Sequence, residues 1–260
     1  MKKGLVLLFI AVVFFGCKEK SNYEKRIELY DTFDKIRLSE SLWNLTERPC
    51  VGNNSYMYIV EVLKRGADVE YKGFNNKPTN PTPFLNASGA LKCLREKDQR
   101  RTEEIDSMEM EAVKIVKFLA SKGANVHATV GDIKLNALHM AANGGREKMI
   151  PVLVNLGLDI NSRNGDPDYG GTVLWHAINA GDLATVKAVV EAGAEINLCL
   201  LDGNSPLDWA MAYANPKAKE ALWLVPYRDQ QAIAEYLQSI GAKHGKNQFK
   251  GMLYFHESKE

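Results

Sequence analysis

The stretch NALHMAANGG, residues 136–145, decides the fold, because the same pattern recurs as TVLWHAINAGD at residues 172–182. Shorter copies are TPFLNAS (82–88) and SPLDWAM (205–211). Each copy begins with a residue whose side-chain oxygen can accept a backbone N–H of a helix's first turn: Thr82, Asn136, Thr172 and Ser205. Each also carries an alanine five residues after that cap, which lets a second helix approach closely: Ala87, Ala141, Ala177 and Ala210. The pattern therefore predicts a helix after each cap.

A second motif follows at a fixed distance and also repeats. Its copies are RGADVEY (65–71), KGANVHA (122–128), LGLDINS (156–162), AGAEINL (192–198) and IGAKHGK (240–246). An apolar stripe precedes its glycine, as at Val186, Val189 and Val190, which predicts a second helix. The glycine then ends that helix in the left-handed conformation. A unit is therefore a helix pair, and internal repetition on this scale is typical of a stacked repeat protein.

The register of cap, alanine and glycine resembles the ankyrin repeat family over roughly residues 39–243. NALHMAANGG with NLGLDIN, and TVLWHAINAGD with EAGAEIN, correspond to the two signatures of that family. The resemblance implies an all-α fold, an ankyrin repeat solenoid of about five helix-turn-helix units with β-turn fingers and two insertions. The expected units are 39–71, 72–129, 130–163, 164–199 and 200–243, followed by a C-terminal tail, 244–260.

Two segments lengthen the regular unit, and one proline interrupts it. The first surplus, residues 91–110, is basic and then acidic without Gly or Pro, so we expect a charged hairpin that extends the two helices of its unit. The second, residues 215–229, contains the apolar Leu222 and Trp223 and is expected to cap the end of the stack. Pro151 falls inside an expected second helix and should distort it.

The N-terminus has the form of an export signal. Lys2 and Lys3 precede a twelve-residue apolar run, Gly4–Phe15. A helix that spans a bilayer needs about 20 apolar residues, so this run is too short to do so, but it has the length of the apolar core of a secretory signal. The junction Gly16-Cys17 then resembles a bacterial lipoprotein signal, which implies a signal peptide at 1–16 and a lipidated Cys17 that begins a linker at 17–38. The alternatives are an uncleaved anchor or a buried helix with an incidental cysteine. Lys18 resembles the residue that directs enteric lipoproteins to the outer membrane, facing the periplasm.

Three further cysteines remain if Cys17 carries lipid. Because three is an odd number, at least one thiol is free or pairs outside the chain, and export into an oxidising compartment means that Cys50 and Cys93 could form a disulfide. The cysteines have neither CxxC spacing nor an adjacent histidine, which argues against a zinc site.

Composition and motifs favour binding over catalysis. Lys and Arg number 33 against 32 Asp and Glu, so we expect no nucleic-acid partner. Metalloprotease, serine hydrolase and phosphate-loop motifs are absent from the sequence, so we expect no catalytic residues, metal or cofactor.

The expected partner is another protein, whose identity the sequence does not give. Ankyrin units present partners with the tips of their turns and the exposed side of their first helices. In this sequence those positions are Asp132, Ile133, Leu135, Asn143, Asp168, Tyr169, Asn179, Leu201, Asp202, Asn204 and Tyr213. Tyr169 and Tyr213 are the expected aromatic anchors. The sequence thus predicts a membrane-anchored interaction module in the bacterial cell envelope. The alternative is an immunity protein that neutralises a toxic enzyme there.

Overall fold

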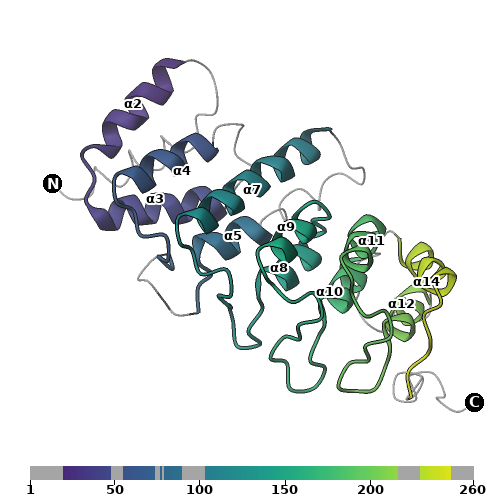
Figure 1. Cartoon of the computed structure of the whole chain (residues 1–260). Helices are drawn as coiled ribbons and strands as arrows, with labels where there is room; N and C mark the ends of the chain where they lie inside the picture. Colours follow the sequence, from purple (N-terminus) through teal and green to yellow (C-terminus); the bar gives the residue numbers. More distant parts are fainter. Residues whose placement is uncertain are drawn as a thin grey trace, which may run out of the picture.

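A computed structural model describes residues 20–47, 55–73, 77, 79–89, 103–215 and 229–246. In this part of the chain every regular element is a helix, and the only β structure consists of two isolated bridges. Figure 1 shows the helices following one another from the N-terminus to the C-terminus. They are α2 (Lys20–Tyr30), α3 (Lys35–Glu47), α4 (Ser55–Lys64), α5 (Pro83–Gly89), α7 (Glu103–Ser121), α8 (Ala137–Gly144), α9 (Met149–Asn155), α10 (Val173–Ala180), α11 (Leu183–Glu191), α12 (Pro206–Ala214) and α14 (Gln230–Ser239).

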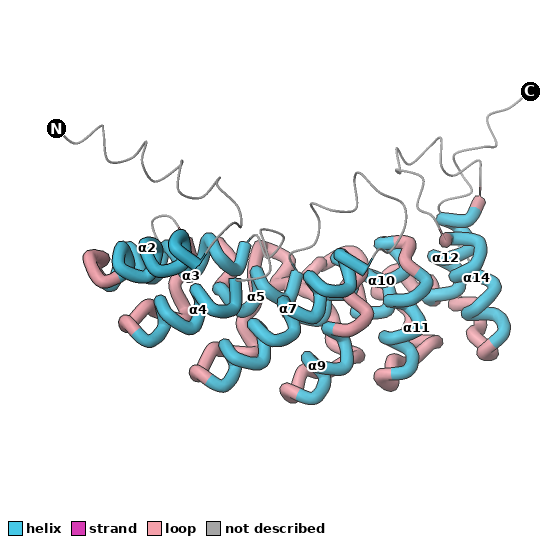
Figure 2. The backbone as a smooth tube through the Cα atoms, turned by 90° about the horizontal axis from the view of Figure 1, so that it is seen from above, coloured by secondary structure: helices cyan, strands magenta, loops and turns pink. Residues whose placement is uncertain are grey.

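Ten of these helices form five pairs, which stack into two rows (Figure 2). The first helices of the units, α3, α5, α8, α10 and α12, contact one another in that order. The second helices, α4, α7, α9, α11 and α14, do the same. The all-α solenoid expected from the sequence is therefore confirmed.

The repeated caps start the first helices as the sequence predicts. The side chains of Asn136, Thr172 and Ser205 accept N–H groups three residues later, at 3.0, 3.1 and 3.2 Å. Two of these helices end at Gly145 and Gly181 in the left-handed conformation. The motif alanines of four units are fully buried, which brings the two rows of helices close together.

Second helices also receive caps from neighbouring units, which the sequence pattern does not reveal. Glu109 Oε1 of α7 accepts the N–H of Lys148 at 2.8 Å, just before α9. Glu111 Oε1 of α7 accepts the N–H of Tyr56 at 3.1 Å, in the first turn of α4. Helix α7 thereby satisfies a free N–H at the start of the second helix on either side of it, which connects its unit to both neighbouring units.

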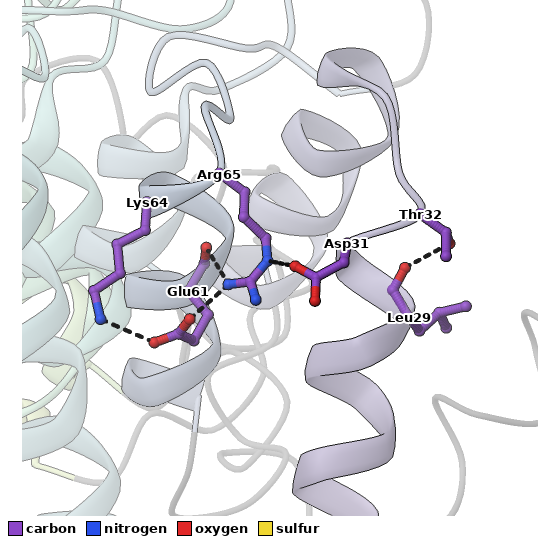
Figure 3. Close-up of polar contacts among 6 residues, drawn as sticks. All are labelled: Leu29, Asp31, Thr32, Glu61, Lys64 and Arg65. Carbon is purple, nitrogen blue, oxygen red and sulfur yellow. Dashed lines mark hydrogen bonds and ion pairs between the residues drawn. The ribbon is translucent and has the colours of Figure 1, made fainter.

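Helix α2 lies inside the range 17–38 that the sequence suggested as a linker, and that expectation needs correction. Tyr30 at its end is buried against the rings of Phe33 and Tyr58. Figure 3 shows Arg65 at the end of α4 bonded to Asp31 through Nε, at 2.6 Å, and to Glu61 through Nη1, also at 2.6 Å. The packed helices therefore begin before residue 39, because α2 contacts α4.

Pro151 does not distort a helix interior, contrary to expectation. Helix α9 begins at Met149, so the proline lies in its first turn, where its missing N–H has no partner to lose. Helix α9 has 7 residues, compared with 9 in α11.

The first insertion is partly described. Helix α7 has 19 residues, so the second helix of that unit is extended as predicted. Residues 91–102 and most of 215–229 lie outside the described residues, as do Cys17, Cys50 and Cys93 and the segment 1–16. Among the described helices none combines the length and the apolar character needed to cross a membrane.

Candidate binding surface

Three fingers project from the C-terminal units, each running from a second-helix motif to the next cap. Finger three spans 128–136, finger four 162–172 and finger five 198–205. Each closes on itself through backbone hydrogen bonds: Val130 with Leu135, Asn164 N–H with Gly171 O, and Leu200 N–H with Asn204 O. In Figure 1 these loops extend to the same side of the helix stack. The units therefore place three loops next to one another.

Hydrogen bonds also connect one finger with the next. The N–H of Gly165 donates to the carbonyl of Ile133 at 2.6 Å, and the N–H of Leu201 donates to the carbonyl of Tyr169 at 2.9 Å. The Arg163 guanidinium bonds the carbonyls of Gly170, at 3.0 Å, and Cys199. Because each loop is tied to its neighbour, the fingers form a connected surface.

Three aromatic rings surround Trp209 where fingers four and five join helices α10 and α12, and Leu201 of finger five lies next to them through the bond of its N–H to the Tyr169 carbonyl. We call Tyr169, Trp175, Leu201, Trp209 and Tyr213 the finger patch. The Trp209 ring lies 5.8 Å from Tyr169, 5.9 Å from Trp175 and 5.6 Å from Tyr213 between centroids. Trp209 and Tyr213 are buried, whereas Tyr169 is 39% and Leu201 60% exposed. The patch is thus a rigid aromatic base that presents two apolar groups to solvent.

Two consecutive glycines make this packing possible. A Cβ at Gly171 would lie 2.8 Å from the Trp175 ring. A Cβ at Gly170 would lie 2.9 Å from the Leu201 side chain, and Gly170 has a positive φ of 54°. Side chains at these positions would displace Trp175 or Leu201, so the glycines shape the patch.

Two histidines lie beneath fingers three and four, with ring centroids 5.1 Å apart. His139 accepts the Asn136 N–H through Nδ1 and donates through Nε2 to the Ser162 carbonyl at 3.1 Å. Burial lowers the pKa of His139 to about 4. Burial, and secondarily the neighbouring His139, lowers the pKa of His176 to about 3. Both rings are therefore neutral and hold the fingers in place.

The predicted contact residues have varied surroundings. Asp132, Asn143 and Asp168 are exposed, while Ile133, Leu135, Asn179 and Asp202 are half-buried. Ile133 and Leu135 have structural roles in finger three, through the bond to Gly165 and the pairing with Val130. The structure brings Tyr169 and Leu201 together, as one exposed pair. Their role in binding a partner stays a prediction.

Tyr213 and Asn204 are not exposed contact residues, contrary to expectation. Tyr213 is only 6% exposed because its ring packs on Trp209 near the end of α12. Asn204 is buried because its N–H and side-chain amide both bond the Asp202 carboxylate, at 2.9 and 2.8 Å, which closes finger five. Their side chains shape the surface from below.

Sequence reasoning missed Trp175 and Trp209, which support the patch. They occupy the third and fourth helical positions after the caps Thr172 and Ser205. Alignment of the repeats on their caps would have placed two tryptophans almost in register on neighbouring helices. That signal indicates an aromatic contact between units.

The described residues contain few groups that could support metal binding or thiol chemistry. There, His, Cys, Asp and Glu side chains do not gather in threes of the kind that could hold a metal ion. Cys199 is half-buried and is a free thiol. What the finger patch can offer a partner is therefore its shape and its apolar contacts.

Known proteins resemble this chain in its repeat region. Residues 107–199 and 138–247 fit the family model described as Ankyrin repeats (3 copies). The chain is 36% identical over 84 residues to ankyrin repeat and KH domain-containing protein mask-1 of Caenorhabditis elegans, covering 32% of the chain and 3% of that protein. It is 27% identical over 125 residues to ankyrin repeat domain-containing protein SAT10 of Stachybotrys chartarum, covering 47% and 6%. It is 26% identical over 119 residues to ankyrin repeat domain-containing protein 37 of Bos taurus, covering 46% and 68%.

Proposed function

Because the chain belongs to the ankyrin repeat family, we propose that it is a protein-protein interaction module that holds its partner against the finger patch. Ankyrin repeats suggest such a module in general terms, and the patch supplies a particular surface for it.

The exposed pair Tyr169 and Leu201 carries this proposal. The Tyr169 ring packs on the buried Trp209, and the Leu201 N–H donates to the Tyr169 carbonyl, so a partner would have little freedom of the Tyr169 ring and of the two backbones to remove. Aromatic anchors in such settings dominate binding energy, and losing one typically costs about 2 kcal/mol or more. Exposed Asp132 and Asp168 lie on neighbouring fingers and would form a polar rim.

Site-specific photocrosslinking tests the proposal without knowledge of the partner. A photoreactive phenylalanine analogue is placed at Tyr169, at Leu201, or at the exposed Lys187 of α11 in the second row of helices. We expect the two finger positions to give the same discrete adduct in cells that naturally make the protein. The Lys187 control should not give it. The proposal fails if the finger positions yield no shared adduct, or if Lys187 yields it equally.

We also propose that the chain is anchored in a bacterial envelope membrane by lipid on Cys17. The support is the sequence around Gly16-Cys17, where a basic start and a short apolar run end abruptly in charge. The named relatives are animal and fungal proteins, so this second proposal rests on the N-terminal residues alone. Replacement of Cys17 by Ser should move the protein from the membrane fraction and remove the mass of the acyl chains. An unchanged fraction and mass would contradict it.

A further inference from the structure

A groove lies between the second helices α4 and α7, in the row of helices that does not contain the finger patch. Its volume is about 700 Å³, and its lining residues are Tyr56, Met57, Glu111, Lys114, Lys117 and Phe118. Helices α4 and α7 contact each other, so the groove is formed by the stacking of two units.

The floor of the groove is aromatic and apolar. The rings of Tyr56 and Phe118 meet edge to face with centroids 5.4 Å apart. Met57 stands beside them with 48% of its surface exposed. A methionine of this exposure is an adaptable apolar contact for an incoming side chain.

The rim of the groove is basic. Lys114 and Lys117 are exposed on one face of α7, and the Lys122 Nζ lies 5.3 Å from the centre of the Phe118 ring. The single carboxylate in the lining, Glu111, already accepts the Tyr56 N–H at 3.1 Å and lies 3.8 Å from the Lys114 ammonium. The groove therefore has positive charge that its own carboxylate does not balance.

The corresponding groove between α9 and α11 differs in chemistry. Its volume is about 440 Å³, and its charged lining consists of Glu147, Glu191 and Lys187 beside Pro151 and three alanines. Acidic charge exceeds basic charge there, and the lining has no aromatic ring. The basic, aromatic groove is therefore a property of α4 and α7 rather than of every pair of units.

We propose that the groove between α4 and α7 binds an acidic segment of a partner protein that carries an apolar side chain. The apolar group lies on Tyr56, Phe118 and Met57, and its flanking carboxylates pair with Lys114 and Lys117. Complementary charge and an apolar floor together specify this partner chemistry. The site is separate from the finger patch, so one module would hold two segments.

Two labelled peptides test the proposal on the full chain. One contains Glu, Asp, Leu and Phe, and the other has Lys in place of each acidic residue. We expect the acidic peptide alone to raise fluorescence anisotropy and to shift the methyl NMR signal of Met57. Lys114→Glu and Lys117→Glu should each weaken that binding about tenfold or more, since both reverse a charge at the rim. Lys187→Glu, in the α9 and α11 groove, is the matched control and should leave it unchanged.

Several results would overturn the proposal. They are equal binding of the two peptides, an unmoved Met57 signal, or loss of binding in Lys187→Glu as large as in Lys117→Glu. Association with phosphatidylglycerol vesicles, without binding of the acidic peptide, would assign the groove to anionic lipid instead. All three lysines are exposed, so circular dichroism melts of the three lysine variants should match that of the parent. Met57→Ser gives a second variant of the groove, one that changes no charge.

Discussion

Acidification should destabilise the repeat stack through the buried pair His139 and His176. Burial lowers their pKa values to about 4 and about 3, from an ordinary value of about 6.5 in the unfolded chain. Asp166 favours protonation of His176, but the effect of burial is larger. At a pH between the lowered pKa of each histidine and about 6.5, the unfolded chain therefore binds more protons than the folded protein. The free energy of unfolding must then fall as the pH drops below about 6.5.

The size of the effect follows from the same pKa values. Between about pH 7 and about pH 5, each histidine lowers the free energy of unfolding by about 2 kcal/mol, or about 4 kcal/mol for the pair. This loss would be a large part of the stability of a typical domain, about 5–15 kcal/mol. The ordinary pKa of a carboxyl group lies at about 4, so this window reports mainly on histidines.

Urea unfolding across this pH range measures the loss. His176→Gln keeps a side-chain acceptor near Asn164, whose amide lies 3.2 Å from Nε2, and should remove about half of the pH dependence. His127→Gln is the matched control, because His127 is exposed, and should leave the pH dependence intact. The reasoning is refuted if His176→Gln retains the full pH dependence, or if NMR shows either buried ring titrating near its ordinary pKa.

Three further substitutions test how units and fingers are held. Asn161→Ala removes the acceptor that receives the Glu195 N–H at 2.8 Å from the next unit, and should lower the free energy of unfolding by about 1 kcal/mol in urea titrations. Gly171→Ala should displace the Trp175 ring and change the tryptophan fluorescence spectrum of the folded protein; an unchanged spectrum would contradict the packing. Asp208→Asn should cost about 1–3 kcal/mol in thermal melts, because the buried carboxylate accepts bonds from its own cap and from the chain after α14. A melt equal to the parent's would rule that out.

The sequence predicts the parts of this fold that depend on local chemistry. Caps such as Thr172, the motif alanines and the turn glycines act within a single unit, so their spacing alone predicts helix pairs and their order. Helix α2 was not predicted from the sequence, because its apolar residues form only a weak stripe along the helix. Its position depends instead on Tyr30 and on the contact of Asp31 with Arg65.

The candidate binding surface was only partly predictable from the sequence, for a related reason. Turn position correctly suggested that Tyr169 and Leu201 would be exposed. Tyr213 also appeared exposed from helix register, but its environment is set by Trp209 and not by its own position in the helix. The hydrogen bonds between fingers are contacts across units, and a pattern that treats each unit alone cannot reveal them.

The affinity of the crosslinked partner for the Tyr169→Ala variant tests the central claim most directly. Titration calorimetry would compare the parent, Tyr169→Ala and Lys187→Ala, with thermal melts to show that each is folded. We predict that Tyr169→Ala weakens binding about 30-fold or more, as loss of an aromatic anchor should, while Lys187→Ala binds like the parent. If folded Tyr169→Ala binds as tightly as the parent, or if Lys187→Ala shows the larger loss, the finger patch is not the site that holds the partner.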